Sequence, residues 1–144
     1  MKKNVTRISS WSNADIAALV LRLGFGILMI PHGLFKLNNF DEIVGEFMSF
    51  AGLGSKISLW SVIIVEIGCS ALLILGLATR LALIPLLVTA CVIVFISHGG
   101  DIFGEAASGF SFLLAYITIF FLGGGKYSLD YLMSGKTKQR HGLR

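Results

Sequence analysis

The stretch Leu81–Ile96 reads LALIPLLVTACVIVFI and carries apolar side chains on every side of a helix. This pattern is typical of a helix surrounded by lipid or by other helices. Stretches of the same kind make up most of the chain, over Ala14–Leu37, Ile57–Leu77, Leu81–Ser97 and Ala107–Gly123. Each is close to the length of about 20 residues that crosses a bilayer. Because backbone polar groups inside lipid must be bonded within their own segment, the sequence predicts an all-α membrane protein, an antiparallel bundle of four transmembrane helices.

The domain organisation follows from these segments. We expect a cytoplasmic N-terminal segment over 1–13, the membrane domain over 14–125, and a cytoplasmic interfacial helix with a basic tail over 126–144. Within the membrane domain, apolar residues recur at helical spacing after the first span, at Phe40, Ile43, Val44, Phe47 and Met48. This periodicity predicts a short amphipathic helix at about 39–50, on the outer face of the bundle.

Charge patterning sets the expected orientation. Basic residues cluster before the first span and after the last, whereas acidic residues fall in the first and third connections. The positive-inside rule then places both termini in the cytoplasm, in a multi-pass protein. Basic clusters beside membrane helices are attracted to anionic headgroups, so the bilayer is the expected partner and nucleic acid is not.

Two charged residues, Arg22 and Glu66, lie deep inside different apolar segments. A charge near the bilayer centre costs roughly 3 kcal/mol or more, so the two should face each other or a shared site. We expect Glu66 to face the bundle interior and to contact the first span through Arg22 or His32. With other polar residues nearby, they form a candidate intramembrane site of Arg22, His32, Lys36, Glu66, Cys69, His98 and Glu105.

Other chemistries are not favoured by the residues. The histidines lack a metal-ligand spacing such as His-x-x-x-His, so no metal site is expected. Cys69 and Cys91 are single cysteines without a Cys-x-x-Cys motif, and no haem or phosphate-binding motif is present. No catalytic residue can be assigned, and the Arg22 and Glu66 charges could simply hold two helices in register.

Several motifs, in order and spacing, resemble the DoxX family of small four-helix bacterial membrane proteins. They are Leu21–Gly26, Pro31–Leu37, Val65–Gly68, Leu75–Arg80 and Gly125–Asp130. The resemblance implies a location in the bacterial cytoplasmic (inner) membrane. Some relatives are subunits of thiosulfate:quinone oxidoreductase or are described as terminal quinol oxidase subunits, which implies a quinone as the candidate cofactor.

Three functions follow as hypotheses. The first is a subunit or accessory of a quinone-linked membrane oxidoreductase, in which the polar residues contact a quinone. The second is a non-enzymatic scaffold that assembles partner subunits or a homo-oligomer. The third is a small transporter that uses the polar intramembrane site.

Overall fold

The structure, a computed structural model, describes the backbone of residues 6–134 and the side chains of residues 13–134. Within that range the regular secondary structure is all helical, and there is no strand. The elements in chain order are α1 (Thr6–Asn38), α2 (Phe40–Ile43), the 3-10 turn η1 (Phe50–Gly52), α3 (Ser55–Ile64), the π-helical segment η2 (Val65–Cys69), α4 (Ser70–Leu75), α5 (Thr79–Cys91), the π-helical segment η3 (Val92–Ser97) and α6 (Ala107–Leu122). A further helical turn covers residues 129–134, and the tail from 135 lies outside the described range.

Three of the described helices are long and apolar enough to cross a membrane. They are Asn13–Asn38, Ser55–Leu75, which joins α3, η2 and α4, and Thr79–Ser97, which joins α5 and η3. The all-α class expected from the sequence is therefore confirmed, and large apolar side chains on the outer surface suit contact with lipid. The last apolar helix, Ala107–Leu122, is shorter, so a fourth crossing stays a prediction.

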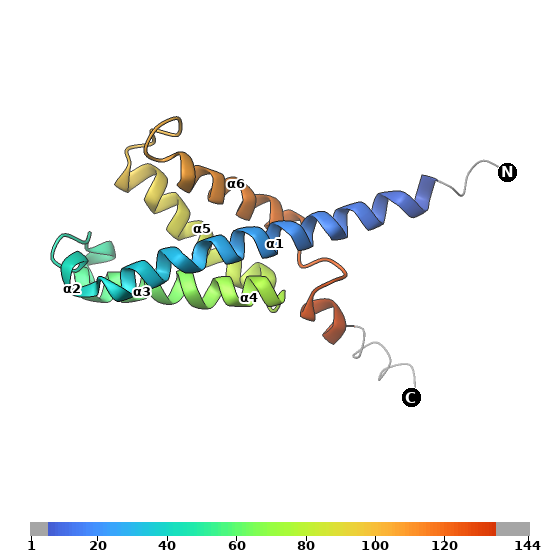
Figure 1. Cartoon of the computed structure of the whole chain (residues 1–144), viewed down its shortest axis with the longest axis horizontal. Helices are drawn as coiled ribbons and strands as arrows, with labels where there is room; N and C mark the ends of the chain where they lie inside the picture. The colour runs from blue at the N-terminus through green and yellow to red at the C-terminus, as the bar shows by residue number, and fades with distance from the viewer. Residues whose placement is uncertain (1–5, 135–144) are drawn as a thin grey trace.

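The helices form two pairs that meet at one end of the molecule and diverge at the other (Figure 1). α1 packs along α3 and α4, α5 packs along α6, and the pairs join through contacts of α1 with α6 and of α4 with α5. We call the end where α4 passes to α5 the Gly76 end, and the opposite end, where α1 meets α2, the α2 end. α1 begins at Thr6, so part of the expected N-terminal segment is helical and extends beyond the other helices in Figure 1.

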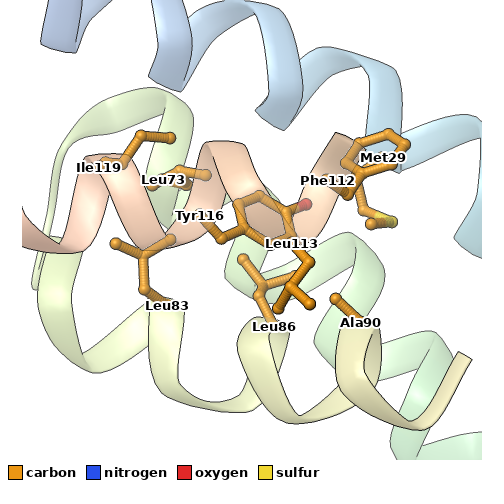
Figure 2. Close-up of a cluster of buried hydrophobic side chains, with 9 residues drawn as sticks. All are labelled: Met29, Leu73, Leu83, Leu86, Ala90, Phe112, Leu113, Tyr116 and Ile119. Carbon is orange, nitrogen blue, oxygen red and sulfur yellow. The ribbon is translucent and has the colours of Figure 1, made fainter. Parts of the chain in front are cut away.

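The core lies between the two pairs of helices and joins side chains from α1, α4, α5 and α6 (Figure 2). Its buried members are Met29, Leu73, Leu83, Leu86, Ala90, Phe112, Leu113, Tyr116 and Ile119. Glycines on α1 bring that helix close to its neighbour. A Cβ at Gly26 would lie 2.6 Å from Ile74 Cγ1, and a Cβ at Gly33 would lie 2.6 Å from Ile67 Cγ1. Only small residues permit such close approach between helices.

The amphipathic helix expected at about 39–50 is much shorter in the structure. α2 ends at Ile43, and the chain then turns and extends before η1. Two serine hydroxyls hold the non-helical connection that follows. Ser58 Oγ accepts a hydrogen bond from Phe50 N at 2.9 Å, and Ser49 Oγ accepts one from Gly54 N at 2.9 Å. Such side-chain hydrogen bonds offer the backbone an alternative to continued helix.

Candidate functional site

A cavity of about 920 Å³ lies at the α2 end, where the helix pairs diverge. Its walls come from α1, α3, η2, α5, η3 and α6, and the connection between α2 and α3 contributes to its mouth. The apolar lining includes Met29, Phe47, Met48, Phe50, Leu53, Val62, Val65, Ile84, Val88, Ile93, Ile96 and Phe112. The polar lining includes His32, Lys36, Glu46, Ser58, Ser61, Glu66, Thr89, Ser97, His98 and Ser108. Apolar walls with a few convergent polar groups are typical of small-molecule sites.

A buried ion pair forms one wall of this cavity. Lys36 Nζ lies 2.7 Å from Glu66 Oε1 and 2.8 Å from Oε2, so the ammonium group donates to both carboxylate oxygens. Glu66 is fully buried, whereas the side chain of Lys36 is 20% exposed. An unpaired carboxylate at this depth would be strongly disfavoured, and hydrogen bonds from a cation offset part of that cost.

Local backbone geometry brings the two partners together. Gly33 lets α1 approach η2 so closely that its Cβ would lie 3.1 Å from Glu66 Cβ. Lys36 follows three residues later, on the same side of α1. Glu66 itself belongs to the π-helical segment η2. The wider i→i+5 hydrogen bonding of a π-helix changes the direction of its side chains, and such segments are frequent at functional sites.

The two histidines of the candidate set also line the cavity. The ring of His32 stands edge-on to Phe112, with centroids 5.7 Å apart. His98 follows the second π-helical segment, η3, and its Nδ1 lies 2.8 Å from the carbonyl oxygen of Ile93. Because a carbonyl oxygen only accepts, Nδ1 of His98 carries a proton in this contact.

Arg22 lies at the opposite end of the molecule, and the expected contact between Arg22 and Glu66 is wrong. One guanidinium nitrogen of Arg22 donates to the carbonyl of Tyr127 at 2.9 Å, and the other lies 3.5 Å from the carbonyl of Leu73. The physical reason is distance along α1. Arg22 and Lys36 are separated by about 21 Å at the rise of an α-helix, and Glu66 is level with Lys36.

The Gly76 end is a polar cluster held by the segment that follows α6. Asp130 Oδ1 accepts from Ala78 N at 2.7 Å, and Oδ2 accepts from Thr79 N and from Thr79 Oγ1, each at 2.9 Å. Burial raises the pKa of Asp130, but these hydrogen bonds and the charge of Arg22 outweigh it and hold the pKa below its usual value. Gly76 has a positive φ of 67°, and a Cβ there would overlap the guanidinium of Arg22.

The structure thus gathers four of the seven candidate residues. Lys36, Glu66, His32 and His98 line one cavity, whereas Arg22, Cys69 and Glu105 are outside its lining. Cys69 is half-buried on η2, and Glu105 is exposed in the connection before α6. Among the side chains that the structure describes, no group of three or more ligating residues could hold a metal ion.

Other residues of the two polar regions were not anticipated. Ser58 is buried at the cavity mouth, and Tyr116 is fully buried in the core next to it. Neither residue could be recognised from the sequence, because one hydroxyl in an apolar helix produces no periodic pattern. Asp130 had a signal in the sequence, since it closes the motif Gly125–Asp130, but its role as a partner of Thr79 depends on two segments about 50 residues apart.

Comparison with known proteins gives one match. A family model described as DoxX matches residues 17–99, which is more than half of the chain. The match begins in α1, contains both Lys36 and Glu66, and ends just after His98. No curated protein and no solved structure matches the chain.

Proposed function

This chain is an integral membrane protein that belongs to the DoxX family, and we propose that it binds a small lipophilic molecule of the quinone class as a subunit or accessory of a membrane oxidoreductase. The observation that carries the proposal is the cavity of about 920 Å³, with apolar walls and the Lys36–Glu66 pair in its lining. Ligand sites commonly have volumes of about 300–1,000 Å³ and few polar groups.

The polar lining suits the carbonyl oxygens of a quinone ring. An ammonium group has three donors, and Lys36 uses two on Glu66, so one is left for an acceptor in the cavity. The rings of His32 and His98 add further polar groups on the same lining. A bound quinone would supply electron transfer, which none of the side chains provides. The part of this chain would be to bind the ring, to exclude water and to hold protons at Glu66 and the histidines.

Access from the bilayer fits a lipophilic ligand. Ile84 and Val88 of α5 line the cavity and are 51% and 50% exposed. These apolar side chains suit a cavity wall that opens toward lipid. An apolar tail could pass here without entering water, because the surface on both sides is apolar.

The closed base of the cavity favours binding over transport. Beneath the lining residues Met29 and Phe112, the core continues through Leu73, Leu83 and Ile119 toward the Gly76 end. A transporter needs access from both sides of the membrane, whereas a binding site needs one. The open volume also distinguishes the site from the interior of a pure scaffold, which we expect to be filled.

The proposal includes a topology of four crossings in the bacterial inner membrane. α6 would be the fourth crossing, lengthened by the residues on either side, with both termini in the cytoplasm. Single cysteines at the exposed positions Glu42 and Glu105 test this topology in a variant without Cys69 and Cys91. Both should react with an impermeant maleimide from outside intact cells. Labelling only after the cells are opened would contradict the topology.

A binding experiment tests the function. We expect the protein in lipid nanodiscs to bind decylubiquinone saturably, and Glu66→Gln to weaken binding at least about tenfold, or about 1.4 kcal/mol. Loss of the carboxylate removes the anchor that positions Lys36. Glu46→Gln is the matched control, because Glu46 also lines the cavity but is exposed at its mouth.

Calorimetric titration with decylubiquinone measures the affinity of wild type, Glu66→Gln and Glu46→Gln. Equal affinity in wild type and Glu66→Gln would show that the ion pair is not part of the site. Absence of saturable binding to the wild type would contradict the choice of a quinone as ligand.

A further inference from the structure

Two buried hydroxyl groups lie directly beneath the cavity. Tyr116 of α6 and Ser70 of α4 are both fully buried, and neither Tyr116 Oη nor Ser70 Oγ has a hydrogen-bond partner among the described residues. Figure 2 shows the hydroxyl of Tyr116 directed toward Phe112 and Met29, which line the cavity. The hydroxyl therefore points to the cavity and not to the Gly76 end.

Glu66 is close to both hydroxyls. Ser70 follows Glu66 by one helical turn on the same side of the chain. The charge of the Glu66 carboxylate acts on Tyr116, and the hydroxyls of Tyr116 and Ser70 approach each other without the geometry of a direct hydrogen bond. The two hydroxyls thus lie close to Glu66, which itself lines the cavity.

The polar atoms at this place are incompletely satisfied. A buried hydroxyl without a partner costs free energy, and native proteins usually satisfy such groups with protein atoms or ordered water. A carboxylate has about four acceptor positions, of which Lys36 uses two. Two hydroxyls and a partly used carboxylate supply the two to four polar partners that a buried water requires.

We propose that the base of the cavity is a water-binding site, in which ordered water bridges Glu66 to the hydroxyls of Tyr116 and Ser70. The water gives Glu66 a polar partner on the side opposite to Lys36. Tyr116 and Ser70 are then positioning residues that act through this water. The site goes beyond the proposed binding of a quinone, because it needs no ligand in the cavity.

The sign of a stability change tests this site. Tyr116→Phe and Ser70→Ala each remove one hydroxyl and little else. If water bridges the hydroxyls to Glu66, each variant loses hydrogen bonds, and the midpoint of thermal unfolding in nanodiscs should fall by about 3 °C. If the hydroxyls are instead unpartnered, removing them relieves a cost, and the midpoint should stay the same or rise. Either of these last results would overturn the proposal.

Two matched controls and a double variant complete the experiment. Tyr127→Phe and Ser111→Ala change exposed residues, and Ser111 bonds only within its own helix, to the carbonyl of Ala107 at 2.9 Å. Both should leave the midpoint within about 1 °C of wild type. Tyr116→Phe should have a smaller effect in a Glu66→Gln background than in wild type, because residues of one hydrogen-bonded network are not additive.

Strict additivity of Tyr116→Phe and Glu66→Gln would overturn the bridge to Glu66. No quinone is present in these measurements. A failure here is therefore distinguishable from a failure of the quinone titration.

Discussion

The two ends of the molecule both bury charge, yet they do so in opposite surroundings. At the Gly76 end, Arg22 and Asp130 are bonded to backbone groups of other segments, at Tyr127 and at the start of α5. At the α2 end, Lys36 and Glu66 are bonded to each other beside a large cavity. Burial of a charge alone therefore does not make a candidate binding site. At the α2 end, open volume beside the charge makes it one.

The connections between helices explain much of the difference. At the Gly76 end, α4 and α5 are separated by only three residues, 76–78, and Asp130 lies across this turn. At the α2 end, α1 and α3 are separated by residues 39–54, and η3 and α6 by residues 98–106. Short connections hold helices together, whereas longer ones let the pairs diverge, as Figure 1 shows.

The largest effect is expected at the Gly76 end. Arg22→Met should lower the free energy of unfolding by about 3–5 kcal/mol, because it removes one partner from a buried charged cluster. Arg80→Met is the control, since Arg80 is exposed at the start of α5, and its effect should be within about 0.5 kcal/mol. Unfolding by sodium dodecyl sulfate in mixed micelles measures both. Equal effects of the two variants would contradict a stabilising role of the buried cluster around Arg22.

A smaller loss is expected from the ion pair at the α2 end. Lys36→Met should cost about 1.5–3 kcal/mol, typical of hydrogen bonds to a charged group. The cost stays below that of Arg22→Met because Lys36 is partly exposed, whereas Arg22 is fully buried and contacts the carbonyls of Leu73 and Tyr127. Lys56→Met, at an exposed position of α3, is the control. The same micelle unfolding assay measures both variants. A loss of unfolding free energy larger than that of Arg22→Met would mean that the α2 end, and not the Gly76 end, holds the more stabilising charges.

The close helix contact beside the ion pair gives a third test. Gly33→Ala should destabilise the protein by about 1–3 kcal/mol, because the added methyl group overlaps Ile67. Gly24→Ala is the matched control on the same helix. A Cβ at Gly24 meets no atom within 4 Å, so this variant should be neutral or gain up to about 1 kcal/mol of helix propensity. Equal tolerance of both changes would mean that α1 and η2 are not in close contact.

The smallest effect concerns pH at the Gly76 end. The folded-state pKa of Asp130 is below its usual value of 3.8, so its ionised form stabilises the fold. This contribution should be fully present above about pH 4 and should fade as the pH falls through the folded-state pKa. Wild type should therefore exceed Asp130→Asn in stability at pH 6 and lose that advantage in acid. A difference independent of pH would contradict ionic stabilisation, and Asp41→Asn, at an exposed position of α2, is the control.

Particular residues show how far sequence reasoning could reach. The cost of burying charge predicted that Glu66 faces the interior and contacts the first span through Arg22 or His32, and its partner on that span is Lys36. Lys36 was in the candidate set but was not expected to be the partner of Glu66, although a lysine side chain can extend several ångströms into the bundle. Arg22 was expected near Glu66 because both charges lie deep inside apolar segments. The segment following α6 supplies the Tyr127 carbonyl and Asp130 as partners of Arg22, and the cost of burying charge does not point to that segment.

By itself, the sequence determined that the chain is helical, that it belongs in a membrane and which side chains are too polar to face lipid. These properties depend on composition and local spacing, since a long apolar segment in lipid must bond its own backbone. Only the tertiary structure decided which charges pair, where the helices separate and where two π-helical segments border a cavity. The physical reason is that apolar side chains stabilise many alternative packings of the helices to a similar extent. Close contacts such as Gly33 on η2, between residues distant in sequence, select one of them.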